Sequence, residues 1–213
     1  MSTVQEIIDF ADRMFLNSET TANKIKDLND IYVDLYVSLN RLKNDIEITN
    51  LSSVADLAIY TLPSNCRIEN IEDVLISTST SGTEFESVSY AGIKDDITSG
   101  KYYGRASEST FFLFEDGLPV QTTGLIIYIY YYKRPTLLDS NNLSAIPELD
   151  VDYHDLLKSG LIQSLASQGP NPETGTADYW QAKYDEKLKK VTNALSERYN
   201  TASTQRSQVR ERM

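Results

Sequence analysis

Residues 125–135 read LIIYIYYYKRP and form the most hydrophobic stretch of an otherwise polar chain. Side chains alternate across a β-strand, so this stretch predicts two different faces. One face carries Leu125, Ile127, Ile129 and Tyr131, and the other carries Ile126, Tyr128, Tyr130 and Tyr132. The first is typical of a core, whereas the second suits a partly hydrated contact surface, because tyrosine has an apolar body and a polar tip. Pro135 ends the strand, and we expect a junction there between a β module and a helical module.

Helical periodicity dominates the residues before position 50. Thr3 and Glu6 have the spacing of a capping box at the start of a short amphipathic helix. A second helix is predicted from apolar residues that recur every three or four positions, namely Ile25, Leu28, Tyr32, Leu35, Leu39, Leu42 and Ile46. Such a seam is typical of one helix in a bundle, and a coiled coil is the alternative.

Short β-type runs follow, at residues 54–62, 68–78, 84–90, 110–114, 118–121 and 125–132. Asp116 and Gly117 predict a hairpin turn between two of them, because both residues tolerate positive φ. We expect exposed loops at 77–83 and 93–107, which are rich in Ser, Thr and Gly.

Two further helices are predicted at the end of the chain. The first begins near Asp150 or Asp152 and ends at Gly169–Pro170; the second begins near Thr176 and has Trp180, Tyr184, Leu188, Val191 and Leu195 on one stripe. Residues 201–213 have little to bury and predict an extended tail. The fold class is therefore α+β, with a bundle of about four helices (1–50 and 136–200), a small antiparallel β module inserted at 51–135 between the second and third helices, and the C-terminal tail.

Charge is unevenly distributed along the chain. The net charge is −11, but residues 183–213 hold eight Lys/Arg against four Asp/Glu, so the first 182 residues carry −15. Such an acidic body repels nucleic acid. No signal peptide or membrane span is predicted, and the single cysteine excludes an internal disulfide, so we expect a soluble protein made in the cytosol.

The sequence offers few candidates for chemistry. His154 is the only histidine, and the acids around it fit the first turn of a helix better than a metal site. Cys66 lacks a nucleophile signature and is interpreted as a buried structural thiol. No catalytic residue, metal ligand or cofactor is therefore predicted. The tyrosines could stack on sugars or bases, but contact with other protein subunits is the more economical interpretation.

Several blocks of the chain resemble the head-to-tail adaptor (connector) proteins of tailed bacteriophages. They are Leu62–Pro63 with Arg67 and Ile68, Tyr130–Pro135 with Leu137–Leu138, and Ile146–Pro147 followed by Tyr153–Leu157. The resemblance implies a structural protein of the virion neck, made in the host bacterium, that forms a ring, commonly of twelve copies. It implies as partners a portal protein, neighbouring adaptor subunits and a downstream tail or neck protein, with double-stranded DNA passing through the lumen without specific binding and no membrane contact.

The resemblance also implies that the C-terminal segment docks on the portal, which gives Arg206, Val209, Arg210, Arg212 and Met213 as candidate portal-binding residues. The tyrosine-bearing strand gives Tyr128, Tyr130, Tyr132 and Arg134 as candidates for contact with neighbouring subunits or the tail protein. Two other function classes remain open: a carbohydrate- or receptor-binding module of a virion, and a hydrolase that uses two carboxylates.

Overall fold

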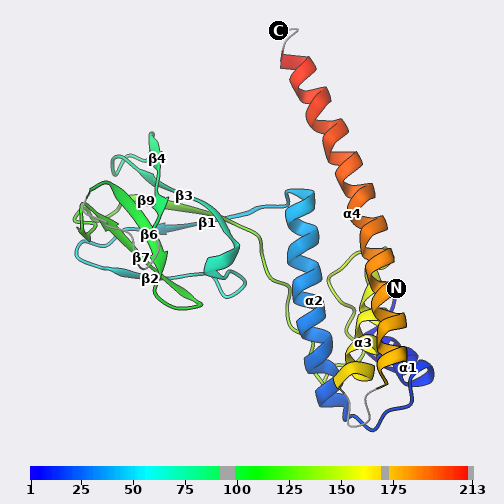
Figure 1. Cartoon of the computed structure of the whole chain (residues 1–213). Coiled ribbons are helices and arrows are strands. Elements are labelled where there is room, and N and C mark those ends of the chain that lie inside the picture. The colour runs from blue at the N-terminus through cyan, green and yellow to red at the C-terminus, as the bar shows by residue number, and fades with distance from the viewer. Residues whose placement is uncertain (92–98, 169–172, 211–213) are drawn as a thin grey trace. The chain divides into compact units, whose positions relative to one another are not determined.

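A computed structural model describes residues 1–91, 99–168 and 173–210, and the chain divides into two units that we describe separately. One unit is helical and consists of residues 1–43 and 135–213; the other is a β unit of residues 44–134 (Figure 1). The predicted α+β class with four helices is confirmed. The β unit begins earlier than the predicted position 51, because the second helix stops at Lys43.

The helical unit contains α1 (Val4–Met14), α2 (Thr21–Lys43), η2 (Val151–Tyr153), α3 (His154–Gln168) and α4 (Thr174–Arg210). Helix α3 packs against α1, α2 and α4. It is buried on most sides for that reason, and its Gly160 lies so close to α2 that an added Cβ would come within 3.0 Å of Ile31. A residue without a side chain is therefore favoured at this contact between the two helices.

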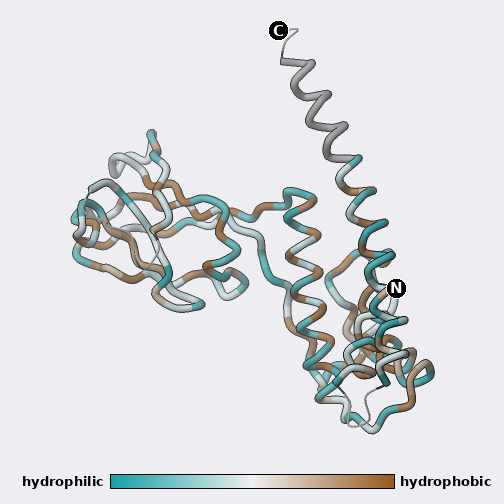
Figure 2. The backbone as a smooth tube through the Cα atoms, in the orientation of Figure 1, coloured by the Kyte–Doolittle hydropathy of each residue, from teal (hydrophilic) through white to brown (hydrophobic). Residues whose placement is uncertain are grey.

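The predicted start of α1 and the seam of α2 are both present. The Glu6 amide donates to Thr3 Oγ1 at 3.2 Å and the Thr3 amide donates to the Glu6 carboxylate at 3.0 Å, which completes the capping box. In α2 the seam residues from Ile25 to Leu39 are buried, and Figure 2 shows hydrophobic residues recurring along this helix. Ile46, the last predicted seam residue, lies outside α2, because Asn44 adopts positive φ (52°) directly after the helix ends.

Helix α4 is longer than predicted. The expectation of an extended tail at 201–213 was therefore wrong for residues 201–210. The helix continues through Arg210, while residues 211–213 lie outside the described part of the chain. Residues 176–210 contain neither glycine nor proline, so the sequence has no signal that would stop the helix. The predicted stripe is present: Trp180 and Leu195 are buried in the helical core, and Tyr184, Leu188 and Val191 pack against it.

The connector at residues 135–150, which leads to η2, is held against α1 and α2 by hydrogen bonds. The side-chain amide of Asn29 donates to the carbonyl of Leu138 at 3.0 Å, and the Leu138 amide donates to Asn29 Oδ1 at 2.8 Å. The Asn29 side chain therefore satisfies both backbone groups of Leu138. The amide of Glu148 donates to the Tyr32 hydroxyl at 2.6 Å, and the amide of Val4 donates to the carbonyl of Ala145 at 2.9 Å. These backbone contacts fix a segment that has no helix or strand of its own.

The β unit contains two sheets. The first has the order β1 (Glu47–Ser52), β9 (Ile126–Tyr131), β3 (Ile71–Ser77) and β4 (Phe85–Ser87), all antiparallel. The second has the order β2 (Ile59–Thr61), β7 (Thr110–Glu115), β6 (Lys101–Arg105) and β5 (Ser89–Tyr90), with β8 (Leu118–Pro119) also on β7 and η1 (Ile68–Asn70) before β3. Val74, Ile76, Ile127 and Ile129 of the first sheet share a core with Tyr60, Tyr103, Phe111 and Leu113 of the second.

The prediction of a purely antiparallel module was wrong. Strands β5 and β6 pair in parallel, with Tyr90 beside Tyr103, and β6 lies inside the stretch 93–107 that was predicted as a loop. A connection of about ten residues separates the two strands, which is long enough to return the chain to the same direction. The predicted hairpin is confirmed, because Asp116 (φ 49°) and Gly117 (φ 80°) join β7 to β8.

Candidate interaction surfaces

The predicted two-faced strand is β9, and it lies inside the first sheet between β1 and β3. Its buried residues alternate with half-buried ones: Ile127, Ile129 and Tyr131 face the core, while Tyr128 and Tyr130 lie on the opposite side. The alternation predicted from the sequence is therefore present from Leu125 to Tyr131, but it was wrong for Tyr132, which was predicted on the same side as Tyr128 and Tyr130 and is buried.

Apolar residues of the neighbouring strands extend the surface around these two tyrosines. Ile48 pairs with Tyr130 in the register of β1 and is 58% exposed, and Leu75 pairs with Tyr128 in the register of β3. The ring of Phe85 lies 5.1 Å from that of Tyr128. We call this surface the tyrosine face; its members are Ile48, Leu75, Phe85, Ile126, Tyr128 and Tyr130.

The other two predicted contact residues lie elsewhere. Tyr132 is buried, with its hydroxyl 3.4 Å from Asn44 Oδ1, so its ring presents little surface to a partner. Arg134 follows the strand, and its amide donates to the carbonyl of Asn65 at 2.8 Å. The structure thus brings Tyr128 and Tyr130 together on one face, whereas Tyr132 is buried and Arg134 follows the end of β9.

The candidate portal-binding residues divide into two groups. Arg206, Val209 and Arg210 belong to the last turns of α4, whereas Arg212 and Met213 lie outside the described residues. Leu195 is the last α4 residue described as buried, so residues 196–210 continue the helix beyond it (Figure 1).

A second aromatic cluster was missed by sequence reasoning. On the second sheet, Tyr102, Phe112 and Phe114 contact one another, with ring centroids 5.4 to 6.5 Å apart. Gly104 makes this possible, because a Cβ at that position would lie 2.2 Å from the Phe112 ring. The alternation in the run 110–114 could have indicated the two phenylalanines, but the tyrosine came from the stretch predicted as a loop.

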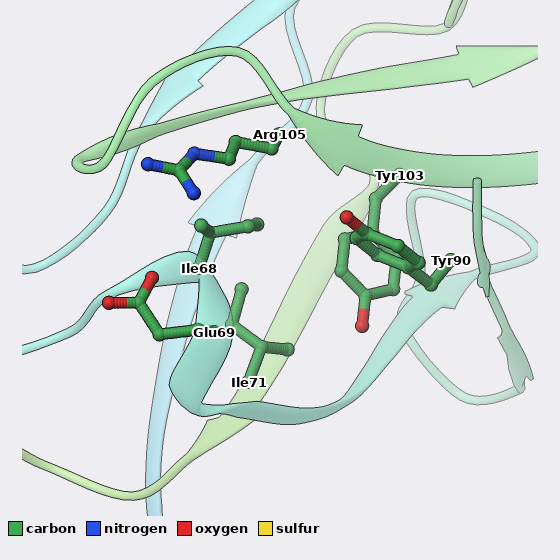
Figure 3. Close-up of a pocket in the computed structure, with 6 residues that line it drawn as sticks. All are labelled: Ile68, Glu69, Ile71, Tyr90, Tyr103 and Arg105. Carbon is green, nitrogen blue, oxygen red and sulfur yellow. The ribbon is translucent and has the colours of Figure 1, made fainter. Parts of the chain in front are cut away.

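A hollow of about 330 Å³ opens in the β unit and was also missed. It is lined by Ile68, Glu69, Ile71, Tyr90, Tyr103 and Arg105. Figure 3 shows the charged groups of Glu69 and Arg105 at one end, the two tyrosine rings at the other, and the isoleucines between them. These residues come from η1, β3, β5 and β6, so no local sequence pattern could have brought them together.

The residues considered for chemistry are embedded in the fold. His154 is buried; its Nδ1 accepts a hydrogen bond from the Ser2 amide at 3.0 Å and its Nε2 lies 3.1 Å from the carbonyl of Leu149. Burial raises the pKa of the Cys66 thiol to about 12, which keeps it protonated. Among the described residues, no group of His, Cys, Asp and Glu is arranged to hold a metal ion. Likewise, none of the described helices is both long and apolar enough to cross a membrane.

A family model described as SU10 adaptor protein matches residues 2–210, nearly the whole chain. The chain belongs to the SU10 adaptor protein family. This is a family of phage head-to-tail adaptors, so the resemblance inferred from the sequence is confirmed. No curated protein matches the chain.

Membership makes this chain a structural phage adaptor, and the SU10 adaptor family is not a family of enzymes.

Proposed function

We propose that this SU10 adaptor is the subunit of a ring in the virion neck, that the ring docks on the portal protein and extends the DNA channel, and that its far side receives the tail. The family match over residues 2–210 is the observation that carries the proposal. The resemblance of the sequence to connector proteins gives about twelve as the expected number of copies.

The C-terminal part of α4 is the proposed portal-binding segment. Residues 196–210 continue the helix after Leu195, the last α4 residue described as buried, over a length of about 22 Å at 1.5 Å per residue. A helical segment of this length is marginal in water without a surface to pack on. Arg206, Arg210 and Arg212 would pair with acidic groups of the portal, and Val209 and Met213 would supply small apolar contacts.

One such segment would bind weakly, and the ring would multiply the contact. When several copies of a segment are held by one assembly, each later binding event becomes intramolecular, and the joint is far tighter than any single contact. A ring would therefore allow attachment through residues 201–213, which hold only three arginines and three apolar residues, Ala202, Val209 and Met213.

The tyrosine face is the proposed contact with neighbouring subunits or with the tail protein. Tyr128 and Tyr130 lie half-buried beside Ile48, which is 58% exposed. Aromatic residues are enriched at protein interfaces because they bury a large area at a small cost in conformational entropy. Arg134, three residues after the end of β9, would lie at the margin of this contact.

The acidic body suits a channel that DNA must traverse without sticking. The first 182 residues carry a net charge of −15, and phosphate groups are held mainly by Lys and Arg. A lumen lined by such a body would repel the phosphate backbone during packaging and ejection.

Deletion of residues 201–213 tests the attachment. The deletion retains Leu195 and the rest of the helical core, so the protein should fold. We expect it to lose binding to purified portal-bearing capsids in a sedimentation assay. The matched control carries the same thirteen residues in scrambled order, which keeps charge and composition; it should bind poorly if the order of apolar and basic residues matters. Unchanged binding by the deletion variant would refute this attachment.

A further inference from the structure

The hollow in the β unit has no part in the proposed ring function, and its chemistry is specific. It lies where β5 and β6 of the second sheet approach η1 and the start of β3 (Figure 3). Its volume of about 330 Å³ is at the lower end of the range for small-molecule sites.

Hydrogen-bonding groups of both kinds line the hollow. Arg105 can only donate, Glu69 as a carboxylate can only accept, and a tyrosine hydroxyl can do both. The guanidinium of Arg105 lies at one end of the hollow, where it can donate to a ligand. Burial, with Asp73 and Glu72 nearby, raises the pKa of Tyr103 to about 12, so its hydroxyl stays protonated.

The charges around the hollow disfavour an ionic ligand. An anion attracted by Arg105 would also meet Glu69, and the carboxylates of Glu72 and Asp73 act on the same region through Tyr103. A cation attracted by these acids would meet the guanidinium of Arg105. A neutral ligand whose groups both donate and accept hydrogen bonds can accept from the guanidinium and donate to a carboxylate without meeting a like charge.

An apolar surface completes the site. The ring of Tyr90 is exposed, with 58% of the residue accessible, and it stands at 72° to the ring of Tyr103 with 5.4 Å between centroids. Ile68 and Ile71 lie between these rings and the charged groups. A flat ligand with an apolar face and polar edges fits this arrangement, because the aromatic face and the isoleucines would cover its C–H groups.

We propose that the hollow binds a neutral sugar of one or two rings, with the sugar face on Tyr90 and its hydroxyl groups on Arg105 and Glu69. This binding activity is additional to the adaptor role and does not depend on ring formation.

The test uses the full chain and three neutral disaccharides, maltose, cellobiose and lactose, titrated to high millimolar concentration in saturation-transfer NMR. We expect saturable binding of at least one of them. Tyr90→Ala should weaken it about tenfold, and Arg105→Met, which keeps the apolar stem but removes the donors, should weaken it similarly. The matched control is Tyr179→Ala, which removes a tyrosine of similar exposure (54%) on α4.

Three results would overturn the proposal: no saturable binding of any of the three sugars, binding that Tyr90→Ala leaves unchanged, or tighter binding of glucuronate or of short neutral peptides than of the sugars. Circular dichroism of each variant establishes that the fold is retained. Portal attachment measured on the same variants should be unaffected, so a failure here leaves the ring proposal standing.

Discussion

Replacing Tyr128 and Tyr130 with serine should disrupt assembly while the single subunit remains folded. Both side chains are half-buried on the outer side of the first sheet, and Tyr128 also contacts the ring of Phe85 at 5.1 Å. The subunit itself covers about half of each tyrosine ring, and the other half remains for a partner to cover.

The cost within the subunit can be worked from the burial. A fully buried tyrosine removes about 150–250 Å² from water, so a half-buried one removes about 100 Å², worth at most about 2.5 kcal/mol at 25 cal/mol per Å². The two substitutions together should cost the subunit about 3–4 kcal/mol, which a domain of ordinary stability tolerates. In an assembly each contact would lose about 1–2 kcal/mol per tyrosine, so binding per interface should weaken about 30- to 1000-fold.

The assay measures copies per portal by native mass spectrometry of variant and unmodified protein on purified portals, with circular dichroism and thermal unfolding of the free subunit. Tail attachment to the decorated portals is measured in parallel. The control Tyr179→Ser removes an exposed tyrosine from the helical unit. Loss of the subunit's own fold would make the two tyrosines core residues, and unchanged assembly together with unchanged tail attachment would refute the role of the tyrosine face.

Three further predictions concern the fold. Asp12→Ala should lower the free energy of unfolding by about 2–3 kcal/mol in urea denaturation, because Lys24 is 6% exposed and its ammonium lies 2.7 Å from the Asp12 carboxylate; adding Lys24→Met should recover most of the loss. Cys66 should not react with iodoacetamide at pH 8 until urea unfolds the protein, since its pKa is raised to about 12. Gly104→Ala should lower the free energy of unfolding in urea by more than about 2 kcal/mol, because the added Cβ would lie 2.2 Å from the ring of Phe112. The control Gly175→Ala in α4, where an added Cβ has no neighbour within 4 Å, should raise the free energy of unfolding slightly.

Local patterns predicted the parts of the fold that local physics decides. The capping box at Thr3, the seam of α2, the alternation along β9 and the turn at Asp116–Gly117 all depend on residues within one or two turns of each other. In each case the pattern corresponds to a specific hydrogen bond, backbone angle or buried face, and the structure contains it.

The misses depend on contacts between distant segments. Strand β1 lies at a sheet edge with Ile48 exposed, so its sequence lacks the strict alternation of a buried strand. Strand β6 is short, follows Ser and Gly residues, and becomes a strand only because β5 and β7 pair with it on both sides. Tertiary pairing overrides weak local preference in such cases.

The end of α4 and the hollow illustrate two other limits. Little burial was expected of residues 201–210, and from this an extended conformation was predicted; the helix continues because nothing in the sequence interrupts it. The hollow joins Glu69 to Tyr90 and Arg105, which lie on different elements of the β unit. The family could be inferred from the sequence because the match extends over residues 2–210. The surfaces could not be predicted in full, because each is built from residues of several strands that only the fold brings together.

The proposed function requires that many copies of this chain assemble on one portal. The most direct test is the mass of the complex that the purified full-length protein forms with purified portal, measured by native mass spectrometry over a range of protein concentrations. We expect one discrete complex with about twelve adaptor copies per portal. A protein that stays a single free copy at every concentration, or that adds to the portal without reaching a fixed number, would contradict it.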